Sequence, residues 1–482
     1  MTLIGSHAAL WPEIVVCLGA MALLTYGVFR PESDREAETV GWLAVLVLVL
    51  AAALVLQQPE EPQRLFGDAF LADSFGRFMK LLVLAGSALA LILAFDEFKA
   101  DRIMKFEYPV LVLLATAGMM MMVSAGDLIA LYLGLELQSL ALYVVAAFRR
   151  DDVRSSEAGL KYFVLGALSS GMLLYGASLL YGFTGQVSFE AIASVARAAT
   201  VADNVGITIG LVFLLVGIAF KVSAVPFHMW TPDVYEGAPT PVTAFFSAAP
   251  KIAAMALLVR VVLSAFPGIV EQWQQIVVFL AIASMLLGAF AAIGQSNIKR
   301  LMAYSSIANI GFALVGLIAN SPEGTQGVLI YMAIYLAMTL GAFACIQSMR
   351  REIGSVEAID ELSGLAVTHP SMAFVLALMM FSLAGIPPLA GFWAKYFVFL
   401  PAIKAGFYTV AVIGVLASVV AAYYYLRIVK IMYFDAPKEK FLPVRVKAGF
   451  VMALTAAFVL LYVLFPSPLF EAASVAAGTF RY

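Results

Sequence analysis

Charged side chains are scarce in this sequence, and their scarcity excludes most soluble proteins. Asp, Glu, Lys and Arg make up 12% of the 482 residues, whereas 63% of the residues are hydrophobic. Soluble domains usually carry about 25% charged residues. The composition also excludes an outer-membrane β-barrel, whose strands alternate between apolar and polar positions. The formal net charge of −2 gives no reason to expect nucleic acid as a partner.

Cysteine, histidine and nucleotide-binding motifs are also rare. The two cysteines, Cys17 and Cys345, lie in apolar runs without a CxxC motif, so we expect no iron–sulfur or zinc site. The absence of GxGxxG and GxxxxGK motifs argues against a nicotinamide or nucleotide site. His7 and His369 fall at the ends of apolar runs, so no two helices offer facing haem ligands. We therefore expect no cofactor and no metal bound by this chain.

The sequence instead contains a series of long apolar runs. A helix needs about 20 residues, at a rise of about 1.5 Å each, to cross a bilayer. Fourteen runs are suitable, near residues 10–29, 40–57, 73–95, 107–123, 127–148, 158–182, 204–225, 239–264, 273–293, 300–319, 327–349, 371–399, 405–434 and 448–466. They predict an all-α polytopic membrane protein with about fourteen transmembrane helices.

Two segments require a separate interpretation. The first ten residues contain no Lys or Arg, so we expect the first run to span the membrane and not to be a cleaved signal peptide. The run 40–57 is short for a span. The more polar segment 187–200 is expected to lie along a surface.

The distribution of basic residues predicts the orientation. Eighteen of the 29 Lys and Arg residues fall in loops on one side and seven on the other. Short loops rich in Lys and Arg face the cytoplasm, so both termini are expected on the periplasmic side. Lys161 lies just inside the sixth run, near the cytoplasmic face. Lys221, Lys251 and Lys395 remain, and none of them belongs to a loop.

Among the carboxylates of the apolar runs, Glu136 lies farthest from a run end. Glu136 and Lys251 are expected near mid-depth, whereas Lys221 is either buried or at the interface. A charge at the centre of a span costs about 2.5–3.5 kcal/mol. A static ion pair accounts for Glu136 and one lysine only. We therefore predict that these groups bind and release protons, since sodium would require several oxygen ligands.

Prolines interrupt two of the runs. Val225-Pro226 breaks the seventh run, and Ile386-Pro387-Pro388 breaks the twelfth, just before Lys395. Proline removes a backbone donor, and broken helices at membrane depth are tolerated only inside protein or beside water. Two broken spans of opposite direction indicate inverted repeats with an ion site between them. His228 follows the first break and is either structural or a relay between Lys221 and Lys251.

Two motifs carry a family resemblance. HMWTPDVYEGAPTPVTAFFSAAPK, at 228–251, and GIPPLAGFWAKYFVF, at 385–399, resemble the antiporter-type proton-conducting subunits of respiratory complex I, and those designated N in bacteria in particular. The resemblance covers nearly the whole chain. It implies fourteen spans with two inverted five-helix repeats. The expected divisions are residues 1–106 with helices 1–3, 107–264 with helices 4–8, 265–434 with helices 9–13, and 435–482 with helix 14.

The resemblance also implies a role. The proton-translocating residues would be Glu136, Lys221, Lys251 and Lys395, supported by His228 and Lys161. Electron transfer from NADH to quinone would belong to other membrane and peripheral subunits, which would hold NADH, FMN, iron–sulfur clusters and quinone. Neighbouring antiporter-like and small membrane subunits, together with lipids, would be the contacts in the bacterial inner membrane.

Two other functions are weighed against this one. The first is a subunit of a multisubunit cation/proton antiporter, and the second is a purely structural membrane scaffold. The motif VYEGAPTPVT, at 234–243, favours the complex I family over the antiporter. The lysines expected at mid-depth disfavour a scaffold.

Overall fold

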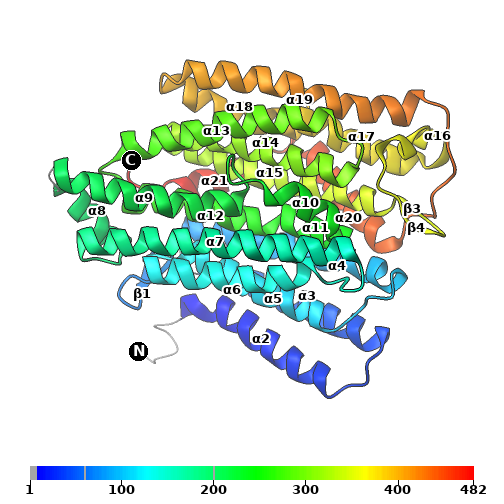
Figure 1. Ribbon diagram of the computed structural model, residues 1–482, viewed down its shortest axis with the longest axis horizontal. Helices are drawn as coiled ribbons and strands as arrows, with labels where there is room; N and C mark the ends of the chain where they lie inside the picture. The colour runs from blue at the N-terminus through cyan, green and yellow to red at the C-terminus, as the bar shows by residue number, and fades with distance from the viewer. Residues whose placement is uncertain (1–7, 59–60, 199–200) are drawn as a thin grey trace.

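The protein is described from a computed structural model, in which residues 8–58, 61–198 and 201–482 are placed. Long helices run side by side along the longest axis of the molecule (Figure 1). The elements are η1 (Ala8–Leu10), α2 (Trp11–Val28), α3 (Asp34–Leu56), β1 (Gln63–Leu65), β2 (Phe70–Ala72), α4 (Ser74–Ala100), α5 (Glu107–Ser124), α6 (Leu128–Ala146), α7 (Val153–Thr184), α8 (Phe189–Ala198), α9 (Val201–Val222), α10 (Trp230–Gly237), α11 (Thr240–Ser247), α12 (Ala249–Ala265), α13 (Val270–Ile293), α14 (Ile298–Ile318), α15 (Pro322–Gln347), β3 (Arg350–Arg351), β4 (Gly354–Ser355), η2 (Ile359–Leu362), α16 (Leu365–Thr368), α17 (Pro370–Ala384), α18 (Ala390–Lys404), α19 (Tyr408–Phe434), α20 (Val446–Leu461) and α21 (Ser467–Ala477).

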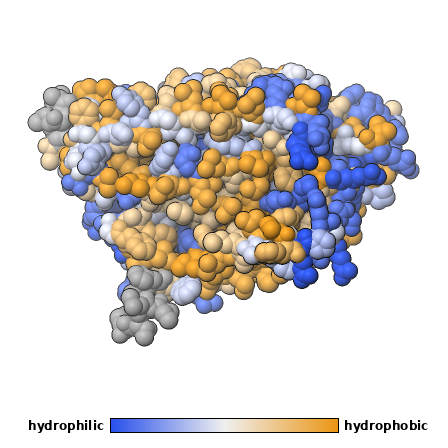
Figure 2. Space-filling view, turned by 60° about the horizontal axis from the view of Figure 1, so that its bottom comes forward, coloured by the Kyte–Doolittle hydropathy of each residue, from blue (hydrophilic) through white to orange (hydrophobic). Residues whose placement is uncertain are grey.

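The predicted spans correspond to these helices. Within the described residues, twelve helical segments are long and apolar enough to cross a membrane, and α17 and α20 are shorter apolar helices. Each of the fourteen predicted runs matches one helix or a pair of consecutive helices. The side of the bundle is predominantly hydrophobic, and hydrophilic side chains gather at one end (Figure 2). The prediction of an all-α polytopic membrane protein is confirmed.

Capping residues explain why some helices exceed their predicted runs. The second span is 23 residues long, not short, because Ser33 caps it by accepting a hydrogen bond from the N–H of Glu36. The sixth begins at Val153, where the Asp152 side chain accepts from the N–H of Arg154. Such side-chain oxygens satisfy the free N–H groups of a first helical turn. Helix starts therefore depend on polar residues that a search for apolar runs does not weigh.

The segment expected to lie along a surface is only partly helical. Its described part contains α8, whose ten residues extend about 15 Å and are too few to span a bilayer. The buried residues Phe189, Ile192, Ala193 and Ala196 form one face of this helix. Residues 199–200 lie outside the described residues. The prediction that this segment does not span is confirmed.

Both predicted helix breaks are present. Between α9 and α10 the backbone at Ser223 has a φ of 64°, and the Val225-Pro226 bond is cis. After α17, Gly385 has a φ of 85°, and the Pro387-Pro388 bond is cis. A φ near +85° is accessible to glycine without a steric penalty. Each break therefore separates two helices that the apolar pattern alone joins into one.

A third break was not predicted. The run 239–264 was expected to be continuous, yet α11 and α12 meet at Ala248, which has φ −108° and ψ −98°. Pro250 occupies the first turn of α12, and a proline ring clashes with the preceding turn of a continuous helix. Pro250 was therefore a signal for this break, and Lys251 follows it directly.

The described ends of the chain lie at the same end of the bundle, here called the terminal face. The Gln58 side chain donates a 2.7 Å hydrogen bond to the carbonyl of Ala9. The N–H of Phe75 donates to the Thr479 hydroxyl at 3.3 Å, near the end of the chain. The other end, the opposite face, carries β3 and β4 (Figure 1). An even number of membrane crossings places the two ends of a chain on the same side, as observed.

A buried ion pair braces the terminal face. Arg260 donates to both carboxylate oxygens of Asp73, at 2.7 and 2.9 Å, and its Nε donates to the Val123 carbonyl at 2.8 Å. Both charged side chains are almost completely buried. Burial raises the pKa of the Asp73 carboxyl, but the Arg260 guanidinium lowers it more, so this pKa lies below its usual range. The pair joins α4, α5 and α12.

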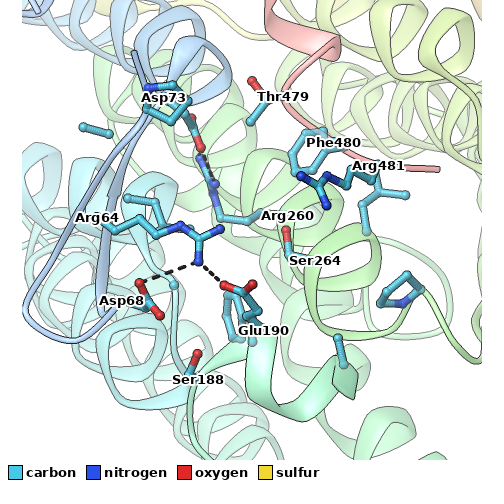
Figure 3. Close-up of a pocket in the computed structure, with 18 of the residues that line it drawn as sticks. Arg64, Asp68, Asp73, Ser188, Glu190, Arg260, Ser264, Thr479, Phe480 and Arg481 are labelled. Carbon is cyan, nitrogen blue, oxygen red and sulfur yellow. Dashed lines mark hydrogen bonds and ion pairs between the residues drawn. The ribbon is translucent and has the colours of Figure 1, made fainter. Parts of the chain in front are cut away.

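A cavity of about 400 Å³ lies beside this brace. Figure 3 shows Arg260 reaching Asp73 and Arg64 pairing with Asp68 and Glu190. These arginines therefore already have carboxylate partners within the chain. Residues of the β1–β2 hairpin, of α8 and of the end of the chain line this terminal-face cavity.

Candidate functional site

Lys221 lies in the last turn of α9 and is 4% exposed. Its ammonium donates to the Ser139 hydroxyl at 2.6 Å and lies 3.4 Å from the Tyr143 hydroxyl. The rings of Tyr143 and Tyr162 lie 5.4 and 5.8 Å from the ammonium. No carboxylate of a described residue forms an ion pair with Lys221. A buried cation is thus held by neutral hydroxyls and aromatic faces.

Glu136 lies on α6, three residues before Ser139, and is half-buried. Its Oε1 atom is buried without a hydrogen-bond partner among the described residues. The carboxylate acts electrostatically on Lys221 but does not contact it. Glu136 and Lys221 form no direct ion pair, because Ser139, one turn further along the same helix, occupies the position next to the ammonium. A single bridging water remains a prediction.

The position of Glu136 is also less enclosed than expected. Leu133 and Leu140, three residues before and four after it, are 54% and 56% exposed. Residues at these spacings share one face of a helix. Glu136 therefore lies at the margin between the interior of the bundle and its apolar outer surface, and not fully between α6 and α9.

Lys251 is the third residue of α12 and is 1% exposed. Its ammonium donates a 2.5 Å hydrogen bond to the Ser306 hydroxyl on α14. The ring of Tyr235 lies 5.3 Å from the ammonium, and the Tyr235 hydroxyl approaches Ser306 without a well-formed hydrogen bond. Within the described chain, Lys251 has no ion-pair partner. Lys251, which was expected near mid-depth, is thus buried inside the bundle without a counter-charge among the described residues.

Buried hydroxyl and amide groups continue beyond Lys251. Ser306 and Tyr335 share a 2.6 Å hydrogen bond. The Tyr331 hydroxyl donates to the Asn309 side-chain oxygen at 2.7 Å, and the Asn309 amide lies 3.4 Å from the Tyr425 hydroxyl. Tyr331 and Tyr335 are four residues apart on α15 and therefore adjacent on one helix face. This hydroxyl series lies on α14, α15 and α19, and within the described residues no hydrogen bond joins its Ser306–Tyr335 pair to its Asn309 group.

The hydroxyl series was not predicted, although the sequence contained a signal for it. Ser305, Ser306 and Asn309 interrupt the apolar run 300–319. Ser305 shares a hydrogen bond with Tyr425. Neutral polar residues inside a span cost less free energy than charged residues do. They therefore gave a weaker signal of function than the three lysines. Their clustering on one helix face was the missed feature.

Lys395 lies on α18 and is 7% exposed. Its ammonium donates to the carbonyls of Leu383 and Ala384 at 3.1 and 3.0 Å, and to the Ser418 hydroxyl at 2.7 Å. The ring of Phe312 lies 4.6 Å away. The break therefore leaves the Leu383 and Ala384 carbonyls free to accept hydrogen bonds from Lys395.

The seven residues from Pro388 to Lys395 would cover about 10 Å along the axis of a continuous helix. Instead α18 begins alongside the end of α17, because the N–H of Gly391 donates to the Ser382 hydroxyl at 3.0 Å. Helical side chains also lean towards the helix N-terminus. The Lys395 ammonium therefore reaches the break directly.

His228 lies in the break between α9 and α10 and is half-buried. Its Nδ1 atom has no hydrogen-bond partner among the described residues. Pro226 is exposed, and Met229 is 56% exposed, so this turn borders the outer surface of the bundle. Within the described residues, no hydrogen bond or ion pair joins His228 to Lys221 or Lys251.

Lys161 lies at the edge of the bundle, with a side chain 40% exposed. Its ammonium pairs with Asp233 and Glu157, each at 2.7 Å. Asp233, on α10, also accepts from Arg300 at 2.7 Å. Lys161 therefore belongs to an ion-pair network at the edge of the bundle, and its place near a membrane face stays a prediction.

Lys299 is buried, although the sequence predicts that it lies in a loop. It is 2% exposed and donates to the carbonyls of Glu236 and Ala238 at 2.8 and 2.7 Å and to Glu357 at 2.9 Å. Burial raises the pKa of the Glu357 carboxyl, but Lys299 lowers it more, so it lies below the usual range. These residues line a cavity of about 690 Å³ at the opposite face.

A metal centre has no support in the described part of the chain. No group of three or more His, Cys, Asp or Glu side chains is arranged there to hold a metal ion. Cys17 and Cys345 are free thiols. The chemistry that the arrangement supports is proton exchange among lysines, hydroxyls and one carboxylate.

Comparisons with known proteins agree on a family. Residues 125–421 match the family described as NADH:quinone oxidoreductase/Mrp antiporter, TM. NADH-quinone oxidoreductase subunit N of Methylobacterium nodulans is 60% identical over 467 residues, which cover 97% of this chain and 96% of that protein.

Solved structures extend the comparison. A chain of respiratory complex I from Thermus thermophilus with bound aureothin is 33% identical, with a TM-score of 0.82 over 96% of this chain and 99% of that one. A chain of the Mrp complex from a Dietzia species has a TM-score of 0.85 over 99% and 98% of the two chains, but its 22% identity shows a shared fold only. The chain therefore belongs to the subunit N family of NADH-quinone oxidoreductases, membrane proteins of the proton-antiporter type.

Proposed function

We propose that this chain translocates protons across the membrane through Glu136, Lys221, Lys251 and Lys395. The observation that carries the proposal is shared by the three lysines. Each is at most 7% exposed, and the hydrogen bonds that its ammonium donates go to hydroxyl or carbonyl oxygens. Burial without a counter-charge disfavours a charged ammonium. Each lysine is thus suited to release its proton when a neighbouring group can accept it.

In the first part of the route, Glu136 controls Lys221. A negative carboxylate favours the protonated ammonium, and its neutralisation favours proton release. The hydroxyls of Ser223 and Thr231, near the first break, are buried without hydrogen-bond partners among the described residues. Buried polar groups of this kind bind internal water. We assign to such water the transfer from Lys221 towards Lys251, with His228 beside it as a supporting group.

In the second part, the hydroxyl series leads from Lys251 towards Lys395. The hydroxyls of Ser306 and Tyr335 relay a proton by accepting one on the oxygen while each donates its own hydroxyl proton onward. The Asn309 amide positions the Tyr331 and Tyr425 hydroxyls and does not itself carry the proton. Phe312 lies three residues after Asn309 and covers the Lys395 ammonium. An apolar ring at this point separates the series from the final lysine, so proton transfer requires its displacement.

The assembly and orientation follow from the family. We infer that this chain sits in the bacterial inner membrane, with both termini periplasmic and Lys161 near the cytoplasmic rim as a supporting group. Residues 107–264 and 265–434 form the two inverted repeats. Other subunits hold NADH, FMN, iron–sulfur clusters and quinone, and neighbouring antiporter-like and small membrane subunits contact this chain.

A subunit of a cation/proton antiporter remains the competing function. The fold is common to both classes, as the Mrp likeness shows. The 60% identity to a subunit N protein favours the redox-driven complex. Purification of the tagged chain with flavin-containing subunits supports the proposal, whereas purification with antiporter subunits alone contradicts it.

Alanine substitutions test the route. The complex carrying Lys221→Ala or Lys395→Ala is reconstituted into vesicles, and NADH oxidation and proton uptake are recorded together. We expect normal assembly and a loss of proton pumping in both. Lys404→Ala, which changes an exposed lysine on the same helix as Lys395, is the matched control and should pump normally. Pumping at the normal level in either test variant contradicts the proposed route.

A further inference from the structure

The short helix α10 lies between the sites of Lys221 and Lys251. Near its start, the Trp230 indole N–H donates to the Phe220 carbonyl at 3.0 Å, next to Lys221 in the chain. The Trp230 ring stacks on Tyr162 at 4.4 Å, and Tyr162 also lies beside the Lys221 ammonium. Near its end, Tyr235 lies beside Lys251. This helix of eight residues therefore contacts residues around both Lys221 and Lys251.

Asp233, in the middle of α10, is shared by two cations from different helices. Its Oδ2 accepts from Lys161 on α7, and its Oδ1 accepts from Arg300 on α14, both at 2.7 Å. Its side chain is 34% exposed. Burial raises the pKa of the Asp233 carboxyl, but Lys161 and Arg300 lower it more, so it lies below its usual range. The carboxylate is thus charged at neutral pH and holds α7 and α14 at once.

The end of α10 is held by polar contacts with α14, and it also packs against Arg154 and Ala158 of α7. Arg300 pairs with Glu236 at 2.9 Å. Lys299 donates to the carbonyls of Glu236 and Ala238, which belong to the last turn of α10 and the residue after it. The final carbonyls of a helix lack internal partners and favour a cation. A shift of α14 would therefore move this end of α10 with it.

Helix α14 also carries the partner of Lys251. Ser306 is seven residues after Lys299, about two turns along the same helix. A change in the charge of Lys251 alters its hydrogen bond to Ser306 and so acts on α14. Through Arg300 and Asp233, that change reaches α10 and the aromatic group around Lys221.

We propose that Asp233 is a positioning residue that ties α10 to α7 and α14 and so couples the proton occupancy of Lys221 to that of Lys251. The proposal rests on the proposed function of these lysines. Lys161 then acts through its pair with Asp233. This role explains the family motif around α10, because Trp230, Asp233 and Tyr235 each hold a different side of this short helix in place.

The test compares Asp233→Asn with Glu361→Gln in the reconstituted complex. Glu361 is a matched control because it is also a carboxylate at the opposite face shared by two cations, Arg351 at 2.7 Å and Lys438 at 3.1 Å. The measurements are protons pumped per NADH oxidised and hydrogen–deuterium exchange of backbone amides 230–237. We expect Asp233→Asn to lower the proton ratio at least about twofold and to speed exchange in α10. Glu361→Gln should change neither.

Further variants separate coupling from folding. Asp233→Glu keeps the charge and should restore most of the ratio. If Asp233→Asn does not assemble, Lys161→Met removes one of the two partners and should give the same partial loss. A normal proton ratio despite faster exchange overturns the proposal.

Failure of the proposed function is distinguishable from failure of this inference. If Lys251→Ala abolishes pumping while Asp233→Asn pumps like the Glu361 control, only the coupling role of Asp233 is wrong. If Lys251→Ala pumps normally, the proton route itself is wrong.

Discussion

Lys251 donates a 2.5 Å hydrogen bond to Ser306, and this bond joins α12 to α14. Both side chains are at most 2% exposed. A hydroxyl can accept a bond from a charged ammonium and donate one to a neutral amine. Ser306 thus serves Lys251 in both protonation states, and through Tyr335 it connects the lysine to the hydroxyl series.

Removal of this hydroxyl should interrupt the series. We expect Ser306→Ala to lower coupled proton pumping strongly, because Lys251 loses its partner in proton transfer. The unpaired donor should also destabilise the fold by about 1–3 kcal/mol. Pumping by vesicles and thermal unfolding of the purified complex measure the two effects. Ser474→Ala, at an exposed position on α21, should leave both unchanged.

The close approach of α17 and α18 predicts an effect at Gly391. A Cβ atom there would lie 1.8 Å from the Ser382 carbonyl oxygen, so Gly391→Ala must push the two helices apart. Lys395 would then lose its bonds to the Leu383 and Ala384 carbonyls. We expect loss of pumping and reduced assembly.

Gly171→Ala is the control for this change, because a Cβ at Gly171 has no neighbour within 4 Å. In a helix interior, alanine is favoured over glycine by about 0.5–1 kcal/mol. This variant should therefore assemble and pump normally. Equal behaviour of the two variants would contradict the importance of the α17–α18 contact.

The brace at the terminal face should contribute to stability and not to pumping. Asp73→Asn leaves Arg260 buried without its counter-charge, and breaking such a pair costs about 3–5 kcal/mol. We expect a lower unfolding temperature for the complex, with a normal proton ratio in the molecules that assemble. Asp68→Asn, at a more exposed carboxylate, should have a small effect.

The pair of Asp73 and Arg260 should make the stability of the folded protein depend on pH, and the lowered pKa of Asp73 sets the direction of this dependence. Because the pKa of Asp73 is lowered in the folded protein, its stabilising contribution is complete above the unfolded value of about 3.9. It is lost as the pH falls through the lower folded value. Thermal unfolding of the wild type below pH 4 should therefore approach that of Asp73→Asn. A constant difference between the two proteins down to the lowest pH would contradict this.

Phe312 should limit passive proton flow. The ring covers the Lys395 ammonium, so Phe312→Ala opens a path for water between Asn309 and Lys395. We expect faster collapse of an imposed pH gradient in vesicles without NADH. A leak rate equal to that of the wild type would show that Phe312 is only a packing residue.

Much of this organisation was predictable because the bilayer imposes a strict length on apolar helices. The fourteen runs, the breaks at Pro226 and Pro387-Pro388, and the burial of Lys251 and Lys395 follow from hydropathy and proline chemistry. These features depend on local sequence, and the structure contains all of them.

Other features depend on how distant helices meet, and the sequence did not reveal them. Lys299 has the position of a loop lysine, yet it is buried because the carbonyls at the end of α10 meet it. Glu136 was expected to interact with Lys221 directly or through one water, and it is Ser139 that the ammonium contacts directly. In both cases the packing angle between helices, which spacing along the chain does not determine, decides the contact.

The most direct measurement is proton pumping by the assembled complex with Lys251→Arg, compared with Lys251→Ala and the wild type. Arginine keeps a buried positive charge and its hydrogen-bonding capacity but does not deprotonate in proteins. If Lys251 works by releasing a proton, both variants should assemble, and both should fail to pump while the wild type pumps. If Lys251 serves only as a fixed charge, Lys251→Arg will pump at the wild-type ratio, and that result would contradict proton transfer through this lysine.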